Sequence, residues 1–273
     1  MNDAVRFAPD LYQGTAGYYD RFRLPYPDAM IDDLLRRAAP SGEGRLLDLA
    51  CGTGQLAFPL GGRFADVWAV DAEADMTRVV RAKAIATDAG HVRTVTVTAE
   101  DLQAEPAGFE LIVIGNAFHR LRRTVVAERT RAWLKPGGCL ALCWSTSPWA
   151  GPRDWQHALA GLLRTWQDAL GVGSRVPPGW EQPRRQDPDH EVLSRAGFAP
   201  VERHEFAAEH RWTIPELAGH IRSTSFLSPS ALGDRSAEFD TALSAELAPY
   251  AGDGSLTDPV SFAYELARRP GRA

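Results

Sequence analysis

Cysteine is scarce in this chain of 273 residues, which contains only Cys51, Cys139 and Cys143. An odd number of cysteines without a C-x-x-C pair predicts neither a disulfide framework nor a zinc site. Cys139 and Cys143 lie four residues apart, so on a strand they would share one face as small core residues. The seven histidines show no H-x-x-x-H or H-E-x-x-H spacing, and we therefore expect no metal ion.

The chain also lacks a basic excess and a long apolar run. It holds 30 Lys and Arg against 35 Asp and Glu, for a net charge of −5, whereas nucleic-acid-binding domains usually carry a surplus of positive charge. No apolar stretch reaches the roughly 18 residues of a membrane-spanning helix. The opening MNDAVRFAPD has no apolar h-region. We expect a cytoplasmic protein with neither a nucleic-acid nor a membrane partner.

Strand-like and helix-like segments alternate in the first half of the chain. The segment 109–116 is a near-continuous apolar run, typical of a strand covered on both faces, and 92–98 is rich in β-branched residues. Amphipathic stretches of helical period separate such runs. This order predicts a doubly wound, mostly parallel α/β sheet. The five strands are expected at residues 45–50, 67–71, 92–98, 109–116 and 139–144.

Other signals extend this domain at both ends. An amphipathic helix with Trp155, Leu159, Leu163 and Trp166 follows the fifth strand, and Gly171 to Pro188 resembles a loop. Further on we expect a helix opened by a capping box, Thr213 with Glu216, and strands at 201–206 and 260–266. We interpret 1–273 as one domain. Its parts are a helical cap (1–44), a binding core (45–145), a helical insert or lid (146–190) and a C-terminal part that completes the sheet (191–273).

A glycine turn follows the first predicted strand, and Gly52-Thr-Gly54-Gln55-Leu-Ala57 fits the dinucleotide fingerprint G-x-G-x-x-G/A. The two glycines allow unusual backbone angles and close approach of a ligand. The next helix, expected at residues 55–63, directs amide groups at that ligand. Asp48, at the end of the strand, would repel a pyrophosphate and attract a cation. It therefore favours S-adenosylmethionine (SAM), a sulfonium without phosphate, over NAD. The alternative is that Asp48 caps a helix or a turn.

Acidic residues also follow the second and third strands. Asp71 lies 19 residues past Gly52, where an acid accepts hydrogen bonds from ribose hydroxyls, although it also fits a solvated turn. Glu100 or Asp101 would accept from an adenine amino group, although acids after strands are common in turns. Because strand ends of a parallel sheet meet at one edge, we expect these acids to surround one nucleotide.

LLDLACGTG, VWAVD, TAEDL, FELIVIGNAFH and WLKPGGCLAL, in this order, resemble class I SAM-dependent methyltransferases. YYDRFRLPYP is similar to the YD-x-x-RP-x-YP opening of a small-molecule subgroup. The resemblance implies a seven-stranded Rossmann-like sheet with an antiparallel final strand, N-terminal helices and a helical lid. It implies that Asp48, Gly52, Gly54, Asn116 and Ala117 lie around the methionine part of SAM, Asp71 at the ribose, Glu100 and Asp101 at the adenine, and Tyr19 and Arg23 over the cofactor. The remaining predicted cofactor-binding residues are Ala50, Gln55, Ala72, Met76 and Leu102.

The chain departs from the family pattern at two positions. Ala50 replaces the first glycine of the usual D-x-G-x-G-x-G loop, so we expect this position not to need a positive φ. Leu24 stands where the subgroup has a proline after Arg23, the residue that the resemblance places on the cofactor carboxylate.

Methyl transfer needs alignment of the reacting atoms more than it needs a base. His119, after the fourth strand, is the candidate general base because histidine exchanges protons near neutral pH; it fits packing or capping equally well. His157 is the second candidate, but it points away from the apolar stripe of its helix and is expected in solvent. Aromatic residues that would line an acceptor pocket are Tyr18, Phe118, Trp144 and Trp149.

The sequence thus predicts a SAM-dependent methyltransferase that acts on an oxygen or nitrogen, less readily a carbon, of a small molecule such as a secondary metabolite. Two alternatives stay open. One is an NAD-dependent oxidoreductase that uses the GTGQLA loop, and the other is a non-catalytic protein of the same fold that only binds SAM.

Overall fold

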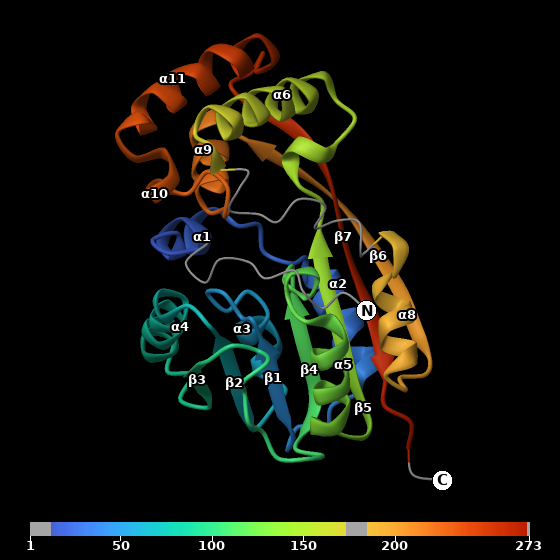
Figure 1. Ribbon diagram of the computed structural model, residues 1–273. Coiled ribbons are helices and arrows are strands. Elements are labelled where there is room, and N and C mark those ends of the chain that lie inside the picture. Colours follow the sequence, from blue (N-terminus) through green and yellow to red (C-terminus); the bar gives the residue numbers. More distant parts are fainter. Residues whose placement is uncertain (1–11, 173–184, 272–273) are drawn as a thin grey trace.

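A seven-stranded sheet forms the centre of the protein (Figure 1). The computed structural model describes residues 12–172 and 185–271. The strand order is β3-β2-β1-β4-β5-β7-β6, and β7 runs antiparallel to both β5 and β6 while β1 to β5 are parallel. The antiparallel final strand confirms the prediction. The strands are β1 (Arg45–Leu49), β2 (Asp66–Asp71), β3 (Val92–Thr96), β4 (Phe109–Gly115), β5 (Leu134–Ser145), β6 (Val201–Trp212) and β7 (Leu256–Arg268).

Helices cover both faces of the sheet, which explains the continuous apolar run of β4. Alternate strand residues belong to different clusters: Leu111 and Val113 pack on one side, and Ile112 and Ile114 on the other. One face is covered by α2 (Asp28–Ala38), α3 (Ala57–Gly61) and α4 (Ala74–Ala86), and the opposite face by α5 (Arg123–Trp133) and α8 (Asp189–Arg195). Cys139 and Cys143 share the first face, as predicted.

A second helical layer lies beyond the carboxyl ends of β1 and β4, where the long strands β6 and β7 reach past the sheet (Figure 1). This layer, here called the cap, contains α6 (Asp154–Ala169), α9 (Ile214–Arg222), α10 (Pro229–Leu232) and α11 (Ser236–Leu247). It has its own buried cluster, which includes Trp166, Leu217 and Phe239. Helix α1 (Ala16–Phe22) lies between the cap and the sheet.

Local sequence signals account for two of the cap helices. The predicted stripe of α6 is buried, with Trp155, Leu159 and Leu163 at 5% exposure or less. Helix α9 begins with the predicted capping box: Glu216 N donates to Thr213 Oγ1 at 3.3 Å, and Thr213 N donates to Glu216 Oε2 at 3.0 Å. The sequence therefore marks α6 and α9 individually as helices.

The structure differs from the predicted boundaries in several places. Strand β5 begins at Leu134 rather than at residue 139. Strand β6 extends to Trp212 rather than residue 206, because an edge strand keeps charged side chains exposed and its polar half resembles a loop. Strand β7 is also longer, and α3 is shorter than the helix expected at 55–63. The loop predicted at 171–188 falls largely on 173–184, outside the described residues. No helix of the described chain combines the length and apolar character that crossing a membrane requires.

Candidate functional site

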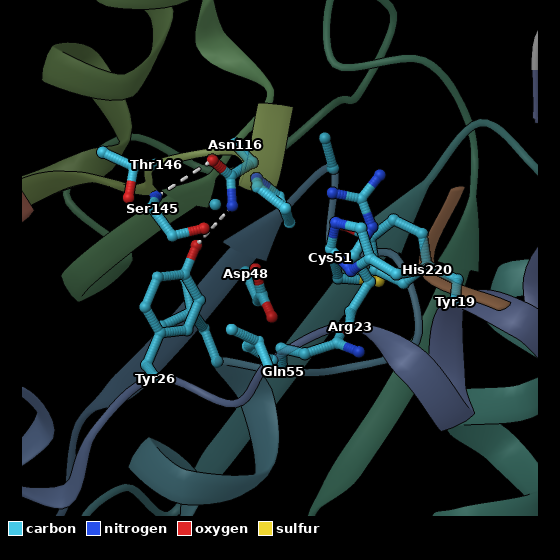
Figure 2. A pocket seen from close by; sticks show the side chains of 15 residues that line it. Tyr19, Arg23, Tyr26, Asp48, Cys51, Gln55, Asn116, Ser145, Thr146 and His220 are labelled. Carbon is cyan, nitrogen blue, oxygen red and sulfur yellow. Dashed lines mark hydrogen bonds between the residues drawn. The ribbon is translucent and has the colours of Figure 1, made fainter. Parts of the chain in front are cut away.

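Two adjoining cavities lie at the carboxyl ends of the central strands. The smaller has a volume of about 30 Å³ and borders the loop after β1; the larger, of about 590 Å³, lies between the sheet and the cap. Figure 2 shows the smaller cavity with Asp48 at its centre, Tyr26 and Asn116 on one side and Tyr19 and His220 on the other. The side chains that border both cavities are Tyr19, Arg23, Asn116, Ser145, Thr146 and His220.

The loop after β1 depends on left-handed backbone conformations. Ala50, Gly52 and Gly54 have φ values of +59°, +54° and +87°. The expectation that Ala50 needs no positive φ is therefore wrong: the turn imposes a left-handed backbone conformation on an alanine. A Cβ added at Gly52 would come within 3.1 Å of the Tyr19 ring, so α1 packs closely on this loop.

Asp48 has the capping role that the sequence left open, and it also borders the smaller cavity. Its Oδ2 accepts a hydrogen bond from Ala57 N at 2.8 Å, which caps α3. The same carboxyl lines the smaller cavity and is 1% exposed. Burial raises the pKa of Asp48 to about 7, the carboxylate of Asp71 adds to this, and the hydrogen bond from Ala57 opposes it. A cation in the cavity would restore the charged form.

Asp71 fixes the same loop from the end of β2. Its Oδ2 accepts from Gly52 N at 2.8 Å and its Oδ1 from Glu73 N at 2.9 Å. Burial raises its pKa, and these hydrogen bonds oppose the rise. Asp71 borders neither cavity, and the same holds for other residues predicted around the loop, the ribose and the adenine: Gly52, Gly54, Ala72, Met76, Glu100, Asp101 and Leu102.

The residues predicted near the adenine make contacts within the chain. Glu100 Oε1 accepts from Arg122 N at 2.8 Å, which fixes the start of α5. Asp101 Oδ2 accepts from Thr98 Oγ1 at 2.7 Å in an exposed turn. Leu102 is buried in the core beside α5. These contacts match the turn role that the sequence left open, and they leave carboxylate lone pairs available to a ligand.

Arg23 borders both cavities and is incompletely paired. Its Nη2 donates to the carbonyl oxygen of Ser223 at 3.3 Å, and its guanidinium lies over the Tyr19 ring at 4.8 Å. Its Nε is buried and has no hydrogen-bond partner among the described residues. Because a buried charged donor without a partner is costly, this nitrogen indicates a place for an anionic group.

The loop after β4 supplies Asn116, Ala117 and His119. Asn116 has φ +51° and receives a hydrogen bond from Ser145 N at 3.3 Å. His119 borders the larger cavity, and its Nε2 accepts a hydrogen bond from Arg120 Nε at 3.2 Å. The lone pair that a general base needs is therefore engaged by a guanidinium in this structure.

Comparison with known proteins identifies the family. A methyltransferase domain model matches residues 46–138. One uncharacterised methyltransferase of Mycobacterium tuberculosis is 31% identical over 151 residues, which are 55% of this chain and 72% of that protein. The chain belongs to the family of SAM-dependent methyltransferases.

Two further comparisons also give methyltransferases. Another uncharacterised methyltransferase of M. tuberculosis is 33% identical over 135 residues, 50% of this chain and 52% of that protein; the chain thus spans about half the length of that relative. The crystal structure of a type II methyltransferase from Anaeromyxobacter dehalogenans, described as putative, has a TM-score of 0.59 at 21% identity and covers 92% of this chain and all of that one. This likeness concerns the fold.

The larger cavity of the methyltransferase is rich in aromatic side chains. Phe118, Trp144 and Trp149 border it, as predicted, whereas Tyr18 does not and stacks on Phe22. His157 is exposed on α6, as expected. Among residues 12–172 and 185–271, no group of three or more His, Cys, Asp or Glu is placed to hold a metal ion.

Sequence reasoning missed several residues that border these cavities: Tyr12, Tyr26, Gln167, His220 and Phe226. Most of them come from the cap or from α1 and its flanks, and they reach the site through contacts between distant segments. His220 Nδ1, for example, lies 3.1 Å from the carbonyl oxygen of Phe22. No local motif marks such a residue, because its role depends on where α9 packs.

Proposed function

We propose that this methyltransferase transfers a methyl group from SAM to an oxygen or nitrogen atom of a small organic molecule, and that it belongs to the small-molecule subgroup that YYDRFRLPYP resembles. The observation that carries the proposal is the larger cavity. Its volume of about 590 Å³ lies in the range of small-molecule sites, and it shares a wall with the cavity beside the glycine loop.

The smaller cavity supports SAM as the ligand of the glycine loop, because two of its side chains, Arg23 and Asp48, match the charged ends of an amino acid. The unpartnered Nε of Arg23 would receive the carboxylate. The buried carboxyl of Asp48 would face a positive charge, which compensates for its lost hydration. A pyrophosphate at this place would meet a buried acid, so the arrangement disfavours NAD.

Methyl transfer requires the protein mainly to align the reacting atoms and to exclude water. When bound, SAM supplies a methyl group on a cationic sulfur, which leaves as a neutral thioether. The chain must hold the nucleophile in line with that bond and close the site against solvent. The aromatic walls of the larger cavity and the cover provided by α1 and the cap suit both tasks.

The charge of the chain and the lining of the larger cavity do not favour nucleic acid as a substrate. The net charge of the chain is −5, whereas nucleic-acid sites carry a basic excess. The larger cavity is bordered by Trp144, Trp149 and Phe226, a lining typical of sites for small organic molecules. A small acceptor therefore fits the site better.

Isothermal titration calorimetry with SAM and S-adenosylhomocysteine tests the cofactor assignment. Arg23→Met should weaken binding of both by roughly 10- to 100-fold, because it removes charge-assisted hydrogen bonds to the carboxylate. The matched control is Arg21→Met. Arg21 is an exposed arginine two residues before Arg23, in the last turn of α1, and borders neither cavity, so its replacement should leave the affinity unchanged.

Formation of S-adenosylhomocysteine in a panel of phenols, amines and activated carbon acids then tests transfer. Absence of saturable cofactor binding would overturn the proposed function. Binding without turnover of any acceptor would favour the non-catalytic alternative.

A further inference from the structure

His220 of α9 occupies the boundary between the two cavities. It is one of the six side chains that border both of them, and it is only 5% exposed. In a methyl transfer the attacking atom must lie next to the methyl group, so the reacting atoms belong where the cofactor cavity meets the acceptor cavity. Residues of this shared wall are the ones that can contact the acceptor atom itself.

The hydrogen bond at Nδ1 fixes the tautomer of His220. Nδ1 lies 3.1 Å from the carbonyl oxygen of Phe22, and a carbonyl oxygen can only accept. Nδ1 therefore carries the proton, and in the neutral ring Nε2 is an acceptor. Nε2 has no hydrogen-bond partner among the described residues.

The residues around His220 restrict the motion of its ring and favour its neutral form. Trp149 and Trp212 pack against it with ring centroids 5.9 and 5.0 Å away. Burial lowers the pKa of His220 to about 3; the charges of Arg23 and His210 add to this, and the hydrogen bond to Phe22 opposes it. A neutral ring of such low basicity orients a donor rather than removing its proton before transfer.

Close packing of α9 on α1 sets the position of this ring. A Cβ added at Gly219 would come within 2.4 Å of the Phe22 ring, so the two helices approach at a residue without a side chain. This approach brings the Phe22 carbonyl to the neighbouring His220. The orientation of Nε2 thus follows from the packing of the backbone.

We propose that Nε2 of His220 accepts a hydrogen bond from the methyl acceptor, and that the acceptor therefore carries an O–H or N–H group at or beside the atom to be methylated. Two other members of the shared wall suit this task less well: Arg23 can only donate, and the side chain of Asn116 is already bonded to Tyr26 and Ser145. This inference rests on the proposed function and narrows its substrate class to hydroxyl or amine compounds that fit an aromatic cavity.

Nitrogen-15 NMR of the full chain saturated with S-adenosylhomocysteine tests the tautomer and the contact. The His220 signals are assigned by their loss in His220→Phe. We expect a neutral ring protonated at Nδ1 from pH 5.5 to 8, and a change in the Nε2 shift on addition of phenol but not of anisole, its methyl ether. A ring protonated at Nε2, or one that titrates near pH 6.5, would overturn the inference.

Ligand-detected NMR with the same two probes measures the selectivity. The wild type should prefer phenol over anisole by roughly 5- to 100-fold, the range for a hydrogen bond to a buried acceptor. His220→Phe should remove this preference, and His220→Gln, whose amide oxygen can take the place of Nε2, should restore part of it. The control His210→Phe alters a ring that also packs on Trp212 but borders neither cavity, and should leave the preference intact.

Different results would contradict SAM-dependent methyl transfer and the hydrogen bond from the acceptor to His220. If S-adenosylhomocysteine does not bind the wild type, the proposed function fails and the inference falls with it. If it binds equally to the wild type and His220→Phe while both bind phenol and anisole alike, the proposed function stands and the inference alone is wrong.

Discussion

The two sides of the site, one formed by the sheet and one by the cap, differ in how far apart in the sequence their residues lie. The sheet side consists of the carboxyl ends of β1, β2 and β4 and the loops that directly follow them, with Asp48 and Asp71 in the strands themselves and left-handed backbone angles a few residues later. The cap side consists of side chains brought together by packing between segments far apart in the chain, such as Phe22 and His220. The glycine-loop side of the site can thus be specified locally, whereas the cap side depends on how distant segments pack together.

Asp48 and His220 show the same contrast in their chemistry. Burial disfavours the charged form of each, raising the pKa of the acid to about 7 and lowering that of the imidazole to about 3. Asp48 faces a cavity in which a cation would restore its charge. His220 lies beside the cation of Arg23, which keeps it neutral. One residue suits a charged cofactor, and the other suits a neutral donor.

The largest effect is expected from emptying the cap core. Phe239 is fully buried against Trp166, with ring centroids 5.3 Å apart, and Phe239→Ala should cost about 3–5 kcal/mol of local stability. If the cap is an energetically separate region, amide hydrogen exchange should accelerate in α9 and α11 more than in β1 and β4. Affinity for S-adenosylhomocysteine, measured by calorimetry, should fall less than the phenol affinity.

Phe109→Ala is the matched substitution in the sheet, since Phe109 is also fully buried and packs on Trp68. It should accelerate exchange in β1 and β4. Equal acceleration throughout the chain in both variants would show that sheet and cap unfold as one unit and that their separation is only geometric.

The second largest effect is expected on the pH dependence of stability, through Asp48 on the sheet side of the site. Its folded pKa of about 7 lies above the roughly 3.9 of an exposed aspartate, so between these pH values the folded state binds more protons than the unfolded state. Stability is therefore lost as the pH rises through this window. Asp48→Asn should stabilise the ligand-free protein by up to about 4 kcal/mol at pH 8, with little effect near pH 4, while weakening SAM binding.

Urea denaturation at several pH values, combined with calorimetry, measures both effects. Asp32→Asn, an exposed position of α2, serves as the control and should change the free energy of unfolding by less than about 0.5 kcal/mol at any pH. A stabilised Asp48→Asn that binds SAM as well as the wild type does would remove Asp48 from the cofactor site.

The parts of the fold that were predictable are those with a local periodic signal. The apolar runs of β1 to β5 and the stripe of α6 are such signals, and so is the capping box of Thr213 and Glu216. The extension of β6 to Trp212 was missed because an edge strand needs only one apolar face. His220 was missed because a histidine on an amphipathic helix has no distinguishing pattern until α9 meets α1.

The smallest effect concerns a residue whose conformation the sequence predicted wrongly. Ala50 has φ +59°, a conformation that costs an L-residue roughly 1–2 kcal/mol. Ala50→Gly removes this strain, although the greater freedom of glycine in the unfolded chain offsets part of the gain, so a net stabilisation of about 0.5–1 kcal/mol is expected in urea denaturation. Ala82→Gly, in the exposed middle of α4, should instead lower the free energy of unfolding by about 1 kcal/mol. Destabilisation of both would mean that the loop holds Ala50 without strain and that the family glycine serves close approach of the ligand rather than backbone geometry.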